Sequence, residues 1–230
     1  MSAPPSESPA ATEFGNLEAN LRFLDGTGLL RPGVRILEIG SGRGTLLHTL
    51  LARELDVVGI ETSADRIVEA QMHYGPLPIR LTSGWHLPFQ ASAFDIVMSF
   101  DVFEHIRDSD AHLEEVKRVL TPGGWYLLQT PNKWTNAVFE TIRWRSFTRW
   151  REDHCALHSY GQLVRRLTEH GFKPQFDQIP VVTPFFRDKV RRYLGRLGAA
   201  VLVIVDLDRL PRHLRTNFYV RARRGDAPLG

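Results

Sequence analysis

Short apolar runs alternate with longer segments of helical spacing along most of this 230-residue chain. The short runs are rich in Val, Ile, Leu and aromatic residues, which is typical of buried strands. Between them, apolar residues recur every three or four positions, as they do in amphipathic helices. The predicted strands are 34–39, 57–60, 79–82, 96–100, 125–129 and 172–179, and the predicted helices are 17–24, 45–51, 65–74, 112–120 and the segment that follows Ser159. This alternation predicts a parallel sheet with helices on both faces.

Two segments, 133–157 and 183–214, interrupt the alternation and are predicted to be insertions. A final apolar run at 217–221 predicts an antiparallel strand at an edge of the sheet. The predicted organisation is a disordered tail at 1–13, a single domain at 14–224 and a loose end at 225–230. The tail prediction follows from its Pro, Ser and Ala content, which buries too little apolar surface to fold.

The first predicted strand breaks into the glycine-rich turn 40–44, read as GSGRG, and a helix follows at once. Glycine lets the backbone turn sharply and lets a ligand come close, and the helix start offers N–H donors and partial positive charge. This order predicts a nucleotide-binding unit. A dinucleotide site prefers a third glycine at position 45, where this chain has Thr45. Glu38, at the strand end, would repel a pyrophosphate but suits a ligand with an ammonium group.

The second predicted strand ends in another carboxylate, Glu61, which lies 21 residues after Gly40. A ribose-binding acid is expected at about this spacing in nucleotide-binding units. Its two oxygens can accept hydrogen bonds from both ribose hydroxyls, whereas the alternative is a solvated acid at a strand end. We therefore expect Glu61→Ala to weaken binding of the nucleoside and to leave the fold intact.

The pattern Glu38-x-Gly40-x-Gly42-x-Gly44 resembles motif I of class I S-adenosylmethionine-dependent methyltransferases. The turn 87–89 (LPF), the pair 94–95 (FD) and the segment 120–132 (LTPGGWYLLQTPN) resemble the same family, so the resemblance covers roughly residues 30–132 at several points. It implies a Rossmann-like α/β fold with a seven-stranded, mainly parallel sheet, helices on both faces and an antiparallel last strand. It also implies S-adenosyl-L-methionine as the cofactor and an insertion after the fifth strand that caps the substrate site.

The resemblance implies a cofactor site at the ends of the first, second and fourth strands. Its predicted members are Glu38, Gly40, Ser41, Gly42, Gly44, Glu61, Thr62, Ser83, Gly84, Trp85, Phe100 and Asp101. Glu38 would hold the methionine ammonium, Glu61 the ribose, and Phe100 with Asp101 would line the methionine side. The family commonly has an aspartate near position 83, and this chain departs from that pattern. Ser83 can still accept a hydrogen bond from the adenine, and Trp85 can cover its face.

Four histidines are candidates for a base that activates a hydroxyl acceptor. Methyl transfer from a sulfonium releases a neutral thioether, so the enzyme mainly has to align the reactants; a hydroxyl acceptor also needs a base poised near neutral pH. The four are His86, His105, His154 and His158. His86 follows Trp85 and can serve cofactor binding instead, so His105, His154 and His158 are kept as the candidate bases.

Asp101, Glu104 and His105 also resemble an acid-glutamate-histidine cluster of ubiquinone-pathway O-methyltransferases, some of which bind magnesium there. Two carboxylates and an imidazole can hold a hard cation. Acids also favour helix starts for dipole reasons alone. That interpretation is preferred, so no metal ligand is assigned, and metal binding by this cluster stays open.

The composition adds few constraints. A single cysteine, Cys155, excludes an internal disulfide framework and indicates a reducing, cytoplasmic compartment; we expect this side chain to pack in the interior. Residues 1–13 lack the apolar core of a signal peptide, and the most apolar run, 199–205, is too short to span a membrane. The net charge of +3 is too small to indicate a partner.

The two insertions leave several partners open. Trp134, Trp144 and Trp150 stand among arginines, which permits nucleic-acid binding, although a helical cap with a basic face is the preferred interpretation. The segment 185–224 has eleven Lys and Arg against three Asp. Beside apolar residues, this charge suits an anionic membrane surface, but it suits a cover for the core or a dimer contact equally well.

The sequence thus predicts a methyltransferase that uses S-adenosylmethionine for O-methylation of a small-molecule acceptor. The alternatives are a methyltransferase for a lipid-linked or anionic acceptor at a membrane surface, a nicotinamide-dependent oxidoreductase, and a non-catalytic nucleoside-binding module. Nucleic acid is not expected as a partner, and the oligomeric state stays open.

Overall fold

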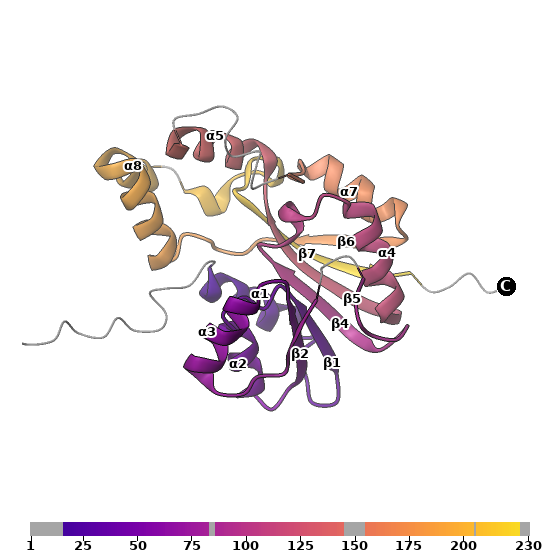
Figure 1. Cartoon of the computed structure of the whole chain (residues 1–230). Helices are drawn as coiled ribbons and strands as arrows, with labels where there is room; N and C mark the ends of the chain where they lie inside the picture. Colours follow the sequence, from indigo (N-terminus) through magenta and orange to yellow (C-terminus); the bar gives the residue numbers. More distant parts are fainter. Residues whose placement is uncertain (1–15, 83–85, 145–154, 205, 226–230) are drawn as a thin grey trace, which may run out of the picture.

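A computed structural model of the chain describes residues 16–82, 86–144, 155–204 and 206–225. Its centre is a seven-stranded sheet with the order β3-β2-β1-β4-β5-β7-β6 (Figure 1). The strands are β1 (Arg35–Ile39), β2 (Asp56–Glu61), β3 (Ile79–Leu81), β4 (Phe94–Phe100), β5 (Leu120–Pro131), β6 (Phe172–Asp177) and β7 (Asn217–Arg224). Strands β1 to β5 pair in parallel. The predicted mainly parallel sheet is therefore confirmed.

The last strand, β7, is antiparallel to both of its neighbours, as predicted. The prediction that it lies at an edge was wrong, because β7 lies between β5 and β6 and the edge strand is β6. The burial of the two strands explains the order. Phe218, Tyr219 and Val220 are consecutive and all buried, which is typical of an interior strand covered on both faces. In β6 the first residue is buried and the rest are partly or largely exposed.

Helices cover both faces of the sheet and enclose one apolar cluster on each (Figure 1). They are α1 (Leu17–Thr27), α2 (Thr45–Leu51), α3 (Ala64–Tyr74), α4 (Ser109–Val119), α5 (Lys133–Trp144), α7 (Tyr160–Glu169) and α8 (Pro184–Ile204), with short 3₁₀ turns η2 (Phe103–His105), η3 (Leu207–Arg209) and η4 (Arg212–Leu214). Buried leucines of α4 and α7 pack in one cluster, and those of α1 and α2 pack in the other.

Most predicted helix boundaries agree with the capping residues in the structure. Ser63 caps α3, Asp108 caps α4, and Ser159 and Gln162 form the predicted capping box of α7. Other boundaries differ: α1 ends at Thr27 instead of residue 24, α4 begins at Ser109 instead of residue 112, and Leu120 opens β5 instead of closing α4. Residues 121–124, between the predicted helix and the predicted fifth strand, are part of β5, which accommodates them with a register shift against β4.

The helices α5 and α8 belong to the two predicted insertions and lie beside the end of β5 (Figure 1). They contact one another through the rings of Phe139 and Tyr193, whose centroids are 6.3 Å apart. α8 is kinked at Gly195, where the backbone leaves helical geometry. Within the described ranges, no helix is long and apolar enough to cross a membrane. That these helices cap a substrate site stays a prediction.

Candidate functional site

The glycine-rich turn after β1 has a backbone that other residues tolerate poorly. Gly40, Gly42 and Gly44 have φ angles of 77°, 54° and 77°, in the left-handed region. A Cβ on Gly40 would overlap with the side chain of Val102, and one on Gly44 would come within 2.6 Å of Leu77 Cδ1. A Cβ on Gly42 would meet nothing within 4 Å. Gly40 and Gly44 thus permit close packing below the turn, while Gly42 faces open space where a ligand can approach.

The turn is held against the end of β2 by its own backbone. Both Gly40 and Ser41 donate their N–H groups to the carbonyl of Ile60, at 2.9 and 3.0 Å, and the Ser41 hydroxyl donates to the same oxygen at 3.1 Å. The N–H of Gly44 donates to the Ser41 carbonyl and closes the turn. The start of α2 is thereby fixed beside the ends of β1 and β2, with its first N–H groups at the ligand side.

Glu61, the predicted ribose ligand, is buried and accepts hydrogen bonds through both carboxylate oxygens. Oε2 accepts from the N–H of Gly42 at 2.8 Å. Oε1 accepts from the N–H groups of Thr62 and Ser63 at 2.8 and 3.0 Å. Glu61 therefore locks the glycine turn to the end of β2, a role that the sequence did not reveal. Oε1 also accepts from the Thr62 hydroxyl at 3.3 Å, whereas Oε2 accepts a single hydrogen bond among the described residues. A carboxylate oxygen has about two acceptor positions, so Oε2 keeps one position for a ribose hydroxyl, and that role stays a prediction.

The remaining cofactor residues lie at the ends of neighbouring strands. Glu38 is buried near the end of β1, which pairs with both β2 and β4. Phe100 ends β4 and packs edge-on against Phe23 of α1. Because Ile39 pairs with Ser99, the end of β4 lies beside the glycine turn. The structure thus brings Glu38, the turn, Glu61 and the end of β4 to one edge of the sheet, where open α/β folds bind their ligands.

Asp101, directly after β4, has a φ angle of 53°, which is uncommon for a residue other than glycine. Its N–H donates to Gln129 Oε1 at 2.8 Å, and this bond supports the strained backbone. The Asp101 side chain is exposed at the carboxyl edge of the sheet. Such strain, held by a neighbouring strand, is common at ligand sites. The other predicted cofactor residues, Ser83, Gly84 and Trp85, lie outside the described residues.

The predicted bases that the structure describes differ in how far they are buried. His105 is exposed on η2, His158 is 7% exposed between Phe103 and α7, and His154 lies outside the described residues. Burial and the nearby positive charge of Arg166 lower the pKa of His158 to about 4. His158 is therefore neutral near pH 7, but it is a weak base in this state.

Glu104 points into the core instead of toward His105. It is 1% exposed and accepts a hydrogen bond from the Thr130 hydroxyl at 3.1 Å. Burial and the charge of Asp101 raise the pKa of Glu104 to about 8. Among the residues that the structure describes, no three His, Cys, Asp or Glu side chains are grouped so that they could hold a metal ion.

Two other sequence candidates are also placed by the structure. His86 is exposed, and its Nδ1 lies 2.8 Å from Glu115 Oε2 on α4, so this histidine joins its loop to a helix. The prediction that Cys155 packs in the interior was wrong: the thiol is exposed and donates to the carbonyl of His105 at 3.3 Å.

The strand order, the glycine turn and the two buried carboxylates define a class I methyltransferase architecture. A family model described as "Methyltransferase domain" matches residues 11–175. Because this match takes in well over half of the chain, the chain belongs to that family. Membership confirms the predicted class of protein and S-adenosylmethionine as the cofactor of the class.

Curated relatives include two proteins named ubiquinone biosynthesis O-methyltransferase. The one from Chelativorans sp. (strain BNC1) is 33% identical over 138 residues, which cover 58% of this chain and 54% of the relative. The one from Brucella ovis is 29% identical over 197 residues, or 84% of this chain and 73% of the relative. The chain thus aligns with little more than half the length of the first of these relatives.

Solved structures show the same fold at low sequence identity. An S-adenosylmethionine-dependent methyltransferase from Mesorhizobium loti has a TM-score of 0.63 and 19% identity, over 90% of this chain and 100% of that chain. The YcgJ protein from Bacillus subtilis has a TM-score of 0.59 and 17% identity, over 91% and 98% of the two chains. The Rossmann-like fold with an antiparallel last strand is thereby confirmed.

Proposed function

We propose that this chain transfers the methyl group of S-adenosylmethionine to a hydroxyl oxygen of a small-molecule acceptor. The observation that carries the proposal is the convergence of Glu38, the glycine turn and Glu61 at the ends of adjacent strands. The names of the curated relatives support oxygen as the methylated atom. The donor supplies an electrophilic methyl group on a sulfonium, and the protein supplies the alignment.

The residues around the turn fit an ammonium-bearing nucleoside. Gly42 faces open space, so the backbone can approach the ligand closely. Glu38 brings negative charge to the methionine side, and a buried carboxylate gains most from a cationic partner. Glu61 would hold a ribose hydroxyl with the acceptor position of Oε2 that the Gly42 N–H group leaves.

A histidine at the carboxyl edge of the sheet is the candidate for removing the proton of the acceptor hydroxyl. His105 is exposed on η2, the turn that follows β4, whereas burial lowers the pKa of His158 and makes that side chain a weak base. We therefore assign proton removal from the acceptor to His105 in preference to His158. His105→Gln should lower the rate of methyl transfer about 100-fold or more, and it should leave cofactor affinity within about twofold of the wild type. His73→Gln, a matched change of an exposed histidine on α3, should leave the rate unchanged.

Transfer of a labelled methyl group to phenols and to their matched anilines tests the proposal. We expect label on the oxygen of phenols, with little on the nitrogen of the anilines. Preferential labelling of anilines would contradict oxygen as the methylated atom. If the protein binds the cofactor but labels neither series, the small phenolic acceptor is wrong.

A membrane-bound acceptor is a second candidate, favoured by the surface of α5 and α8. Trp134 and Val138 of α5 are 60% and 62% exposed, and Tyr193 of the basic helix α8 is 40% exposed. Exposed aromatic and apolar side chains beside basic residues suit the interface of an anionic bilayer. Co-sedimentation with phosphatidylglycerol vesicles, but not with phosphatidylcholine vesicles, would support this candidate. Equal absence from both pellets would contradict it.

A further inference from the structure

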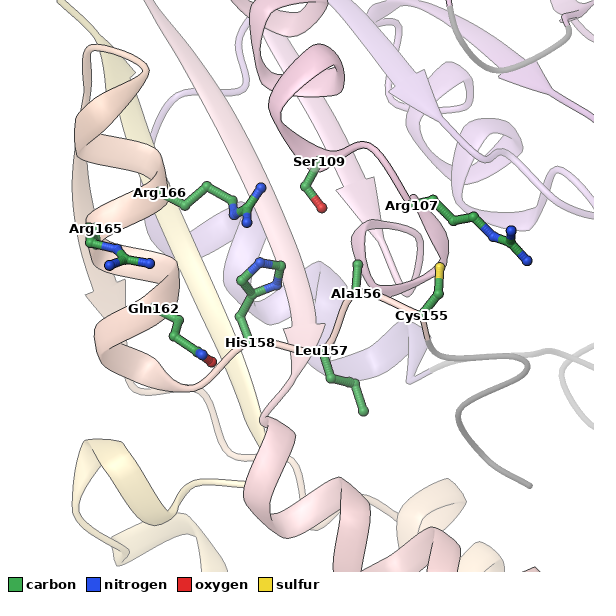
Figure 2. A pocket seen from close by; sticks show the side chains of 9 residues that line it. All are labelled: Arg107, Ser109, Cys155, Ala156, Leu157, His158, Gln162, Arg165 and Arg166. Carbon is green, nitrogen blue, oxygen red and sulfur yellow. The ribbon is translucent and has the colours of Figure 1, made fainter. Parts of the chain in front are cut away.

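A cavity lies between α7, the start of α4 and the segment 155–158, and no residue of the glycine turn lines it (Figure 2). Its volume is about 240 Å³. None of the predicted cofactor residues lines it. Among the described residues that do, three are arginines and none is an aspartate or glutamate. The cavity therefore offers a positively charged, polar lining that the methyl-donor site does not use.

Arg166 supplies the best-placed positive charge. Its side chain extends from α7 toward His158 and the start of α4, whereas Arg107 points away from this group (Figure 2). One N–H of Arg166 donates to Asp110 at 2.7 Å. A guanidinium has five N–H donors in a planar fork that matches the two oxygens of a carboxylate or phosphate. The ion pair with Asp110 fixes the direction of the fork and uses only part of its donors.

His158 provides an independent sign of a missing ligand. The side chain lines the cavity and is 93% buried, since only 7% of its surface is exposed. Its Nδ1 atom is buried and has no hydrogen bond of normal geometry among the described residues, although the backbone carbonyl of Ala156 lies close enough to the ring to raise its pKa slightly. Buried polar atoms are almost always hydrogen-bonded, so an unsatisfied one calls for a specific explanation. A bound oxyanion beside Arg166 would give this nitrogen an acceptor in the tautomer that carries hydrogen on Nδ1.

The start of α7 reinforces the positive potential of the cavity. Gln162, in the first turn of α7, lines the cavity, and that turn contains no acid, so its partial positive charge can attract an anion. Ser109, the first residue of α4, also lines the cavity, but Asp108 and Asp110 offset the positive charge at the start of that helix. Arg165, from the same helix as Arg166, stands at the rim with a long, 3.8 Å contact to Glu169. The cavity thus combines two guanidinium groups, the start of α7 and a buried histidine nitrogen.

We propose that this cavity binds the carboxylate or phosphate group of a small ligand, held by Arg166 and His158 with Arg165 at the rim. The volume is below that of a typical drug-sized pocket, so the ligand is a small anion or the anionic end of a larger molecule. The inference goes beyond the proposed function and stands without it, because no residue of the methyl-donor site takes part.

Histidine side-chain NMR spectra of the whole chain, recorded without cofactor, test the inference. Benzoate, inorganic phosphate and the neutral benzamide are titrated separately, and the signals of His158, assigned with His158→Gln, are followed. We expect saturable shifts of the His158 signals with benzoate or phosphate and none with benzamide. Saturation by benzoate alone identifies a carboxylate ligand, and saturation by phosphate alone identifies a phosphate. Absence of saturable shifts with both anions, or equal shifts with benzamide, would overturn the inference.

Matched variants connect the binding to the cavity. Arg166→Gln should weaken anion binding about tenfold or more, because it removes a charge-assisted fork. Arg165→Gln, at an exposed position where folding is unaffected, should weaken it about threefold, and Arg22→Gln on α1 should have no effect. Unchanged affinity in both cavity variants would also overturn the inference. Calorimetry with S-adenosylhomocysteine on the same sample reports separately on the methyl-donor site, so the two proposals fail independently.

Discussion

Replacement of Glu61 separates its structural role from its predicted role in cofactor binding. In the structure, three backbone N–H groups, those of Gly42, Thr62 and Ser63, donate to its carboxylate. Glu61→Ala leaves all three without this acceptor. Glu61→Gln keeps the shape of the side chain but turns one acceptor oxygen into an NH₂ donor, which must face at least one of the same N–H groups.

The expected magnitudes follow from these contacts. A hydrogen bond to a charged group contributes about 1.5–3 kcal/mol when it is well shielded, and the N–H groups here are only partly buried. We therefore expect Glu61→Ala to lower the free energy of unfolding by about 3 kcal/mol and Glu61→Gln by about 1–2 kcal/mol. For a domain of this size, 3 kcal/mol corresponds to a Tm decrease of about 6–12 °C. This revises the expectation from the sequence, which placed no structural role on Glu61.

The effect on cofactor binding is measured separately. If a ribose hydroxyl donates to the remaining acceptor position of the carboxylate, its loss should weaken binding of S-adenosylhomocysteine about tenfold or more. Urea denaturation gives the stability, and calorimetry gives the affinity under conditions where each variant is folded. Glu69→Gln is the matched control, since Glu69 pairs with Arg43 of the same turn at 2.7 Å but is half-exposed. This control should change stability by less than about 1 kcal/mol.

Two results would refute parts of this reasoning. Wild-type stability of Glu61→Ala would show that the carboxylate does not hold the glycine turn. Affinity of Glu61→Gln within about twofold of the wild type would remove Glu61 from the ribose site.

Two further predictions concern the turn and the packing of α4 on α7. Gly40→Ala should abolish cofactor binding and lower the Tm, because its Cβ would overlap with Val102 and its φ angle is positive; binding at wild-type affinity would contradict the packing account. Partial burial opposes protonation of His170, but hydrogen bonds to Glu114 and Asp110 outweigh it and raise the pKa above its ordinary value. The contribution of protonated His170 to the stability of the fold is complete below about pH 6.5 and is lost as the pH rises through the raised pKa. His170→Gln should therefore lower the free energy of unfolding by at most about 1 kcal/mol near pH 6, and by a smaller amount near pH 9. Urea denaturation at both pH values measures this difference, and an equal cost at both would show that the charge of His170 does not contribute.

Much of the fold could be predicted from local patterns. The strands and helices up to α4 follow from apolar periodicity, and the caps at Ser63, Asp108 and Ser159 follow from residue types whose side chains accept backbone N–H groups. The position of β7 could not be predicted from periodicity, because the order of strands depends on long-range pairing. Its run of three buried residues, Phe218 to Val220, was the available signal for an interior strand.

The candidate site was predictable to a similar extent. Glu38, the glycine turn and Glu61 were found because strand ends and positive-φ glycines leave a sequence signature. The locking of Gly42 by Glu61 was not found, since that hydrogen bond joins residues 19 positions apart. The inward direction of Glu104 depends on its contact with Thr130, 26 positions away, and no spacing rule reports such a contact.

The anion cavity was also beyond sequence reasoning. It is assembled from residues of α4, α7 and the segment before α7, and the interest of His158 lies in a buried nitrogen without a hydrogen bond of normal geometry among the described residues. The sequence singled out His158 only for its residue type and its place after an insertion. Burial, which decides both its pKa and its accessibility, is a property of the packed structure.

Calorimetric titration of the wild-type protein tests the central claim most directly. The claim is that carboxylates at the ends of β1 and β2, with the glycine turn between them, hold an ammonium-bearing nucleoside. We expect one saturable site for S-adenosylmethionine and for S-adenosylhomocysteine, and no measurable heat with a nicotinamide dinucleotide. Saturable binding of the dinucleotide, with none of either sulfur nucleoside, would contradict the account.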